Sequence, residues 1–92
     1  MKRATASVQH AVGLHARPAA RFVKRAKGYE SAITVRNITR DGEPVDAKSL
    51  VKVIKIAAAQ HQEVEIVTDG PDEEEALAGL LDFLSDVDEE ER

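Results

Sequence analysis

The chain reads Gly13-Leu14-His15-Ala16-Arg17-Pro18-Ala19-Ala20-Arg21-Phe22-Val23 at residues 13–23, and this stretch decides how the remainder is interpreted. Pro18 has the fixed φ that suits a first helical turn, where its missing N–H removes no hydrogen bond. Apolar residues then recur at helical spacing, namely Ala19, Phe22, Val23 and Ala26, and a glycine at position 28 can end the helix. We therefore predict a helix over 18–27, with His15 just before it.

The segments around this helix predict four strands. Alternation of small or apolar residues with polar ones favours strands at 4–8, around Ile33 and Val35, and around Val64 and Ile66. Asp41-Gly42 is a hairpin signal, and Pro44 indicates that the returning segment at Val45 is an edge strand.

Two more helices follow from the apolar spacing. The first begins at residues 46–49, and its predicted buried stripe is Leu50, Val53, Ile54 and Ala57, with Val51 off that stripe. The second follows Asp72, a candidate N-cap with Glu75 in capping-box register, and its predicted stripe is Leu77, Leu80, Leu81 and Leu84. The order β-α-β-β-α-β-α predicts an α+β fold, an open-faced two-layer sandwich in which a four-stranded antiparallel sheet carries three helices on one face.

Composition narrows the function classes. The 92 residues predict a single domain, 1–92, with an acidic tail at 87–92 that we expect to fray. A net charge of −4 and 3% aromatic residues argue against nucleic-acid binding. The absence of cysteine removes disulfides and zinc–thiolate sites, and we expect neither a metal nor another cofactor. No apolar run is long enough for membrane insertion and no signal peptide is evident, so we expect a cytoplasmic monomer.

The chemistry is expected at the start of the helix over 18–27. His15 can offer an imidazole nitrogen as a nucleophile near neutral pH. The backbone N–H groups of Ala16 and Arg17 and the helix dipole would stabilise an attached phosphoryl group, and the Arg17 guanidinium adds five donors. Taken alone, a histidine beside a helix start is more often a surface or capping residue, and an arginine there more often a solvated cation.

Together these residues form a more specific pattern. The run from Gly13 to Ala20 resembles the active-site signature of HPr, the histidine-containing phosphocarrier family of the bacterial phosphoenolpyruvate:sugar phosphotransferase system. The resemblance continues at 22–23, 26–28, 47–50, 64–66, 70–71 and 73–76, and so covers nearly the whole chain. It implies that His15 accepts a phosphoryl group on Nδ1 from phosphorylated enzyme I, assisted by Arg17, and passes it to a IIA domain of a sugar permease. The protein would then be a carrier and not an enzyme.

The resemblance also implies two surface roles. Ser49 matches the serine that an HPr kinase/phosphorylase modifies in some members, although a plain helix-start serine is an equal alternative. A docking face for partner proteins would comprise Ala16, Arg17, Ala20, Lys48, Leu50, Val51, Lys52 and Ile54, whose apolar centre and cationic surroundings suit acidic partners.

Some positions depart from the family pattern. Val12 replaces a frequent asparagine, Val51 a frequent aromatic residue and Ile54 a polar one, and the segment 37–46 is longer than in short members.

The glutamate-rich start of the last helix and the acidic tail resemble the nitrogen-branch carrier, NPr. A regulatory module whose phosphorylation controls a transcriptional regulator or another partner therefore stays an alternative. An enzyme using His15 as acid, base or nucleophile is a third reading, against which no water-activating group is recognisable.

Overall fold

The computed structural model describes residues 1–9, 13–14 and 16–85, with the side chain of residue 16 left aside. The elements in chain order are β1 (Lys2–Ser7), α1 (Ala16–Lys27), β2 (Ala32–Asn37), β3 (Val45–Asp46), α2 (Leu50–Lys55), β4 (Glu63–Asp69) and α3 (Glu73–Ser85). The predicted order of strands and helices is confirmed.

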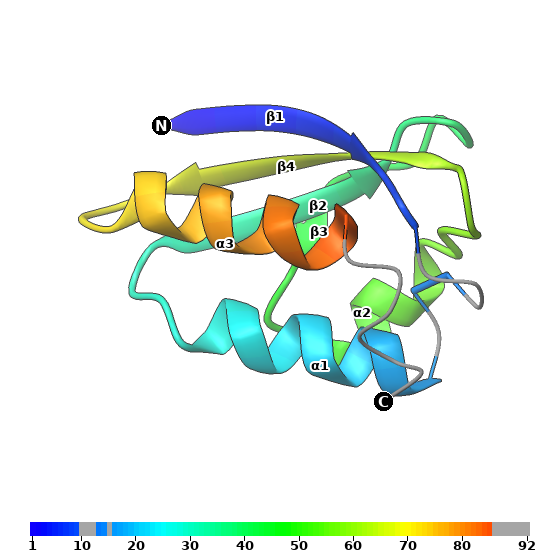
Figure 1. Cartoon of the computed structure of the whole chain (residues 1–92), viewed down its shortest axis with the longest axis horizontal. Coiled ribbons are helices and arrows are strands. Elements are labelled where there is room, and N and C mark those ends of the chain that lie inside the picture. Colours follow the sequence, from blue (N-terminus) through cyan, green and yellow to red (C-terminus); the bar gives the residue numbers. More distant parts are fainter. Residues whose placement is uncertain (10–12, 15, 86–92) are drawn as a thin grey trace.

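The sheet has the strand order β1-β4-β2-β3, and all three pairings are antiparallel. The central strand β4 alternates strictly, with Val64, Ile66 and Thr68 buried beneath the helices. The three helices lie on one side of this sheet, and among the described residues no helix lies on its other face (Figure 1). The predicted open-faced α+β sandwich is thus confirmed, and the short strand β3 occupies an edge, as Pro44 predicted.

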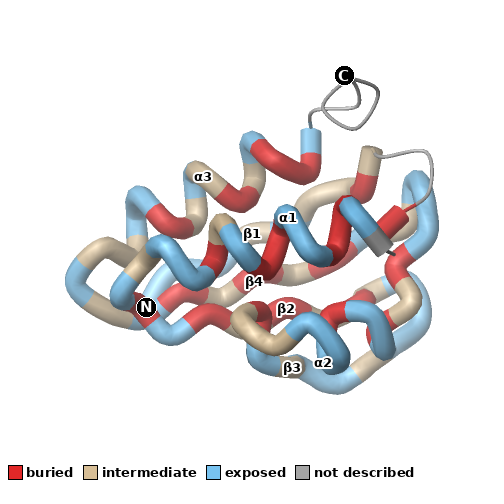
Figure 2. The backbone as a smooth tube through the Cα atoms, turned by 90° about the horizontal axis from the view of Figure 1, so that it is seen from below, coloured by how far each residue is buried: buried red, intermediate tan, exposed pale blue. Residues whose placement is uncertain are grey.

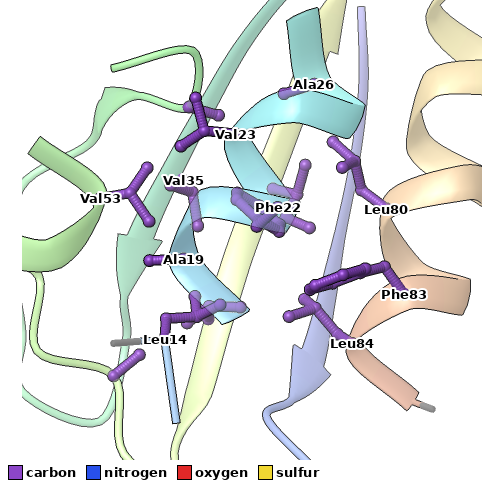
Figure 3. Close-up of a cluster of buried hydrophobic side chains, with 14 of the residues drawn as sticks. Leu14, Ala19, Phe22, Val23, Ala26, Val35, Val53, Leu80, Phe83 and Leu84 are labelled. Carbon is purple, nitrogen blue, oxygen red and sulfur yellow. The ribbon is translucent and has the colours of Figure 1, made fainter. Parts of the chain in front are cut away.

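The core forms where α1 and α3 meet the sheet. The predicted apolar stripe of α1 is buried throughout, while its opposite face is exposed (Figure 2). Phe22 lies at the centre of the cluster, facing Leu80, Phe83 and Leu84 of α3 (Figure 3). The rings of Phe22 and Phe83 are 5.9 Å apart between centroids and tilted by 59°. Such an aromatic pair contributes about 0.5–1.5 kcal/mol beyond the area it buries.

Several predicted element boundaries differ in the structure: β1 begins at Lys2 and not at Ala4, and α2 begins at Leu50 because Asp46 pairs in β3 and Ser49 is the N-cap. β1 ends at Ser7 and not at Val8, although Val8 is fully buried. Its backbone is held by the turn before β4, since the Val8 N–H donates to Gln62 O at 2.9 Å and the His61 N–H donates to Val8 O at 2.7 Å. α1 begins at Ala16, two residues earlier than predicted, which keeps Pro18 within the first turn.

The predicted stripe of α2 is wrong at most of its positions. Within the helix only Val53 is buried, while Leu50 and Ile54 are 41% and 37% exposed. The helix has just six residues, so it presents a single narrow face to the core. It ends before Ala57, whose φ of +52° turns the chain away from the helical path, and Ile56 takes the expected core position.

The buried face of α3 is also rotated from the prediction. Ala76, Leu80, Phe83 and Leu84 are buried, whereas Leu77 and Leu81 are only partly buried. Gly79 lies between Ala76 and Phe83 on this face, and a Cβ added there would overlap the Tyr29 hydroxyl. The side of α3 that carries this glycine therefore turns towards the end of α1.

The predicted capping box before α3 is wrong as well. The Asp72 carboxylate accepts hydrogen bonds from the Ser31 hydroxyl at 2.6 Å and from the backbone N–H groups of Glu30 and Ser31, each at 2.9 Å. Glu73, and not Glu75, reaches back to the backbone, accepting from the Gly70 N–H at 3.0 Å. Asp72 thus joins the start of α3 to the loop between α1 and β2.

These contacts make stability depend on pH. The Ser31 hydroxyl, followed by the Glu30 N–H, lowers the pKa of Asp72 below its ordinary value of 3.8. A lowered pKa in the folded state stabilises the protein above the unfolded-state pKa, and this contribution is lost as the pH falls through the folded-state pKa. We expect Asp72→Asn to reduce stability at about pH 7 and to narrow the difference in unfolding free energy between about pH 7 and about pH 3. Urea denaturation at both pH values measures this, and an unchanged difference would contradict the assignment.

Candidate functional site

The segment before α1 is fixed to the segment after α2 by a backbone contact. Gly13 has a φ of +69°, and a Cβ at this position would overlap Ala58 O and lie 2.8 Å from Ala59 Cα. The next residue, Leu14, donates its N–H to Ala58 O at 2.8 Å, and its side chain is fully buried. The chain can take this path because residue 13 is glycine.

The N-terminus of α1 follows this anchored segment. The backbone N–H groups of Ala16 and Arg17 belong to the first turn, which contains no acidic residue. A helix N-terminus presents such N–H groups together with the positive end of the dipole, an arrangement that favours anions. The Arg17 side chain is exposed while Pro18 and Ala19 are buried. The predicted acceptor, His15, lies outside the described residues, as do Val12 and the acidic tail over 87–92.

An apolar patch on α2 lies exposed. Val51 is 62% exposed, and the exposed parts of Leu50 and Ile54 belong to the same short helix. We call these three residues the α2 patch. The exposure of Val51 agrees with its predicted place off the buried stripe. Leu50 and Ile54 are exposed and not buried, so they add to the apolar surface that a partner could cover.

The structure brings part of the predicted docking face together between α1 and α2. A shallow depression of about 240 Å³ is lined by Ala20, Val23, Lys24, Lys27 and Leu50. Ala20 and Leu50 were predicted, whereas Lys24 and Lys27 were missed. Their positions four and seven residues after Ala20 are a signal that could have found them, because this spacing repeats on one face of a helix.

The three polar residues predicted at the start of α2 have different environments. Lys48 is partly buried and its Nζ donates to Tyr29 O at 2.8 Å, which ties the approach to α2 to the end of α1. Lys52 is exposed. Ser49 is the N-cap of α2 and not a residue of its first turn, and its hydroxyl accepts from the Lys52 N–H at 3.5 Å.

Charge is segregated among the elements. Every charged side chain of α1 and α2 is a lysine or arginine, whereas every charged side chain of α3 and β4 is an aspartate or glutamate. The cationic side chains therefore gather on α1 and α2, although the net charge of the chain is −4. A second, larger depression of about 740 Å³ along α1 is lined by Arg21, Lys24, Arg25, Gly28 and Tyr29.

Within residues 1–9, 13–14 and 16–85, no group of three or more His, Cys, Asp or Glu side chains is placed to bind a metal ion. Over the same part of the chain, no helix has the length and apolar composition needed to cross a membrane.

Comparison with known proteins identifies the family of this chain. Residues 2–86 match the family model described as the PTS HPr component phosphorylation site. The chain is 31% identical over 87 residues to phosphocarrier protein NPr of Escherichia coli K12, covering 94% of both chains. Its fold superposes on an HPr crystal structure from Thermoanaerobacter tengcongensis with a TM-score of 0.85 and 38% identity, covering 91% of each chain. The chain therefore belongs to the HPr family of phosphocarrier proteins of the phosphotransferase system.

The family also contains much longer proteins. The chain is 44% identical over 77 residues to a multiphosphoryl transfer protein of Vibrio cholerae, a match that covers 84% of this chain. It spans about a fifth of that relative's length, since the matched part is 19% of it.

The contact at Gly13 generates a test. We expect Gly13→Ala to lower the unfolding free energy by about 2 kcal/mol or more, because the new Cβ meets backbone atoms and the left-handed φ is strained for alanine. Urea denaturation measures the change. Gly42→Ala is the matched control, since its Cβ would lie 3.5 Å from Asn37 O, an ordinary contact. Equal stability of the two variants would show that the Gly13 approach is not a constraint.

Proposed function

We propose that His15 accepts a phosphoryl group on Nδ1 from phosphorylated enzyme I and passes it to a IIA domain. The observation that carries the proposal is the family match over residues 2–86, because His15 is the histidine within the signature at 13–23. In the transfer, an imidazole lone pair forms the new P–N bond while the bond to the donor breaks, and the donor keeps the electron pair. Donation to the acceptor repeats this exchange, and water takes no part.

Features of the described residues support this role. The N–H groups of Ala16 and Arg17 at the start of α1 suit the negative charge of a phosphoryl group on the preceding residue. The exposed Arg17 guanidinium can pair with that phosphoryl group in two-pronged geometry. The chain acts as a carrier, so each molecule would take one phosphoryl group and then need an acceptor.

The docking face supports exchange between partners. We assign to it Ala16, Arg17, Ala20, Lys48, Leu50, Val51, Lys52 and Ile54, and the depression adds Lys24 and Lys27. A small apolar patch surrounded by cations suits partners with an acidic rim around an apolar centre. Because the face is shallow, a partner's active site can approach the start of α1 closely.

A regulatory role is the second candidate. The NPr relative aligns over 94% of both chains. The alternative that we propose beside it is that phosphorylation controls the binding of a regulatory partner. In that reading Ser49 could be a second modification site, recognised by an HPr kinase/phosphorylase. The Ser49 hydroxyl already accepts from the Lys52 N–H, and the exposed Lys52 side chain carries a positive charge that suits a phosphate on this N-cap.

The phosphorylation proposal is tested by intact-mass spectrometry. We expect incubation with phosphoenolpyruvate and enzyme I to add one phosphoryl group that acid removes, because phosphohistidine is acid-labile. His15→Ala should gain none. A gain that persists in His15→Ala, or no gain with an enzyme I that phosphorylates its own carrier, would contradict the proposal.

The docking face is tested by a charge placed in the α2 patch. We expect Val51→Glu to reduce the rate of phosphoryl transfer from enzyme I about tenfold, since a carboxylate at the apolar centre would oppose an acidic partner. Stability should change by no more than about 0.5 kcal/mol because the site is exposed. Ala78→Glu adds the same charge on the exposed side of α3 and serves as the control. Equal transfer rates in the two variants would remove the patch from the interface.

A further inference from the structure

We infer that Asn37 and Gln62 are positioning residues that hold the segment before α1 in place through the turn at residues 56–62. This inference rests on the proposed function, because that segment leads directly to the proposed acceptor. It is carried by a continuous series of hydrogen bonds that begins in the buried end of β2 and ends at Leu14.

The series begins at the Asn37 side chain, which is only 1% exposed. Its Nδ2 donates to Ile56 O at 3.0 Å and to Gln62 Oε1 at 3.2 Å. Its Oδ1 accepts from the Arg40 N–H at 3.2 Å. Both ends of the amide are therefore used, as a buried polar group requires, and the donor end is directed at the turn that follows α2.

Gln62 extends the series to the neighbouring backbone. Its Oε1 accepts from the Ala59 N–H at 2.9 Å as well as from Asn37. Asn37 Nδ2 holds Gln62 Oε1 in place, and the same oxygen accepts from the Ala59 N–H. The peptide between Ala58 and Ala59, to which this N–H belongs, therefore has a fixed orientation. The carbonyl of Ala58 belongs to this peptide, and it is the acceptor for the Leu14 N–H at 2.8 Å.

This arrangement constrains the site specifically, beyond adding to general stability. Ala57 has a left-handed φ of +52°, a conformation that is unfavourable for alanine, so the turn needs external support to keep its path. Asn37 and Gln62 supply that support through their hydrogen bonds to Ile56 O and the Ala59 N–H. The bond to Ile56 O also holds the end of α2, so the same amide fixes the helix that carries the α2 patch.

The test uses the half-buried Gln62, where substitution leaves the core intact. Gln62→Met keeps the length of the side chain but removes the acceptor. Gln62→Glu keeps an acceptor for both donors and is the conservative rescue. Asn37→Asp removes the donor end of the amide and serves as a second disruption. Ser31→Ala, which loses the hydrogen bond to Asp72 beyond the opposite end of α1, is the control for general destabilisation.

Two readouts separate positioning from stability. The first is amide hydrogen exchange of Leu14 relative to the amides of β4, which needs no partner protein. We expect Gln62→Met to raise this ratio about tenfold, whereas Ser31→Ala affects both sets alike. The second is the rate of phosphoryl transfer from enzyme I, for which we expect about a tenfold loss in Gln62→Met and in folded Asn37→Asp, and little change in Gln62→Glu or Ser31→Ala.

The outcomes distinguish this inference from the proposed function. If Leu14 and β4 exchange in step in Gln62→Met, and transfer equals that of the wild type, the positioning role is overturned while the carrier role stands. If the wild type accepts no phosphoryl group, the carrier role fails, and the exchange ratio alone still decides whether Gln62 positions Leu14. Loss of transfer in Gln62→Glu equal to that in Gln62→Met would also overturn the assignment.

Discussion

The contact between Gly13 and the backbone of Ala58 and Ala59 is the constraint on which the functional end of the molecule depends. Two stretches of chain that are far apart in sequence meet there without a side chain between them. Since Leu14 can then bond to Ala58, the start of α1 and the end of α2 are held in one place. The shared surface of the two helices, with its exposed apolar patch and its cations, follows from this junction.

The apolar residues of α2 differ in whether they are buried or exposed. Val53 alone anchors the helix to the core from within its own span, and its remaining apolar residues, Leu50, Val51 and Ile54, are exposed. A six-residue helix has little intrinsic stability, because most of its backbone groups lie within a turn of an end. Its N-cap Ser49 and the Lys48–Tyr29 bond at one end, and the Asn37 amide at the other, compensate for this.

The long helix α1, the strand alternation and the edge position of β3 could be predicted from local sequence. Pro18 and the helical spacing of Phe22 and Val23 predict α1, and Pro44 predicts that β3 is an edge strand. These signals are local, because a proline constrains its own backbone and the spacing is read from neighbouring residues. The signature around His15 likewise identified the family, which comparison confirmed. The roles of the individual site residues stay predictions, because the acceptor lies outside the described residues.

The errors arose where distant residues decide the outcome. In α3 the buried face includes the side on which Gly79 meets Tyr29, a contact between elements that periodicity cannot reveal. Asp72 had the local pattern of a cap, but Ser31 and Glu30 offer its carboxylate three donors from another loop. Leu50 and Ile54 were predicted both for the buried stripe of α2 and for the docking face, and only their exposure agrees with the structure, because apolar spacing does not distinguish core from surface.

All charged side chains of α1 and α2 are cationic, so this side of the molecule presents a local positive potential although the net charge is modestly negative. In the field of a negatively charged macromolecule, such a body experiences a torque that turns its α1–α2 side forward before contact. Orientation during diffusion shortens the rotational search. Ionic strength therefore governs how often a collision is productive, and it does so without altering any contact in the final complex.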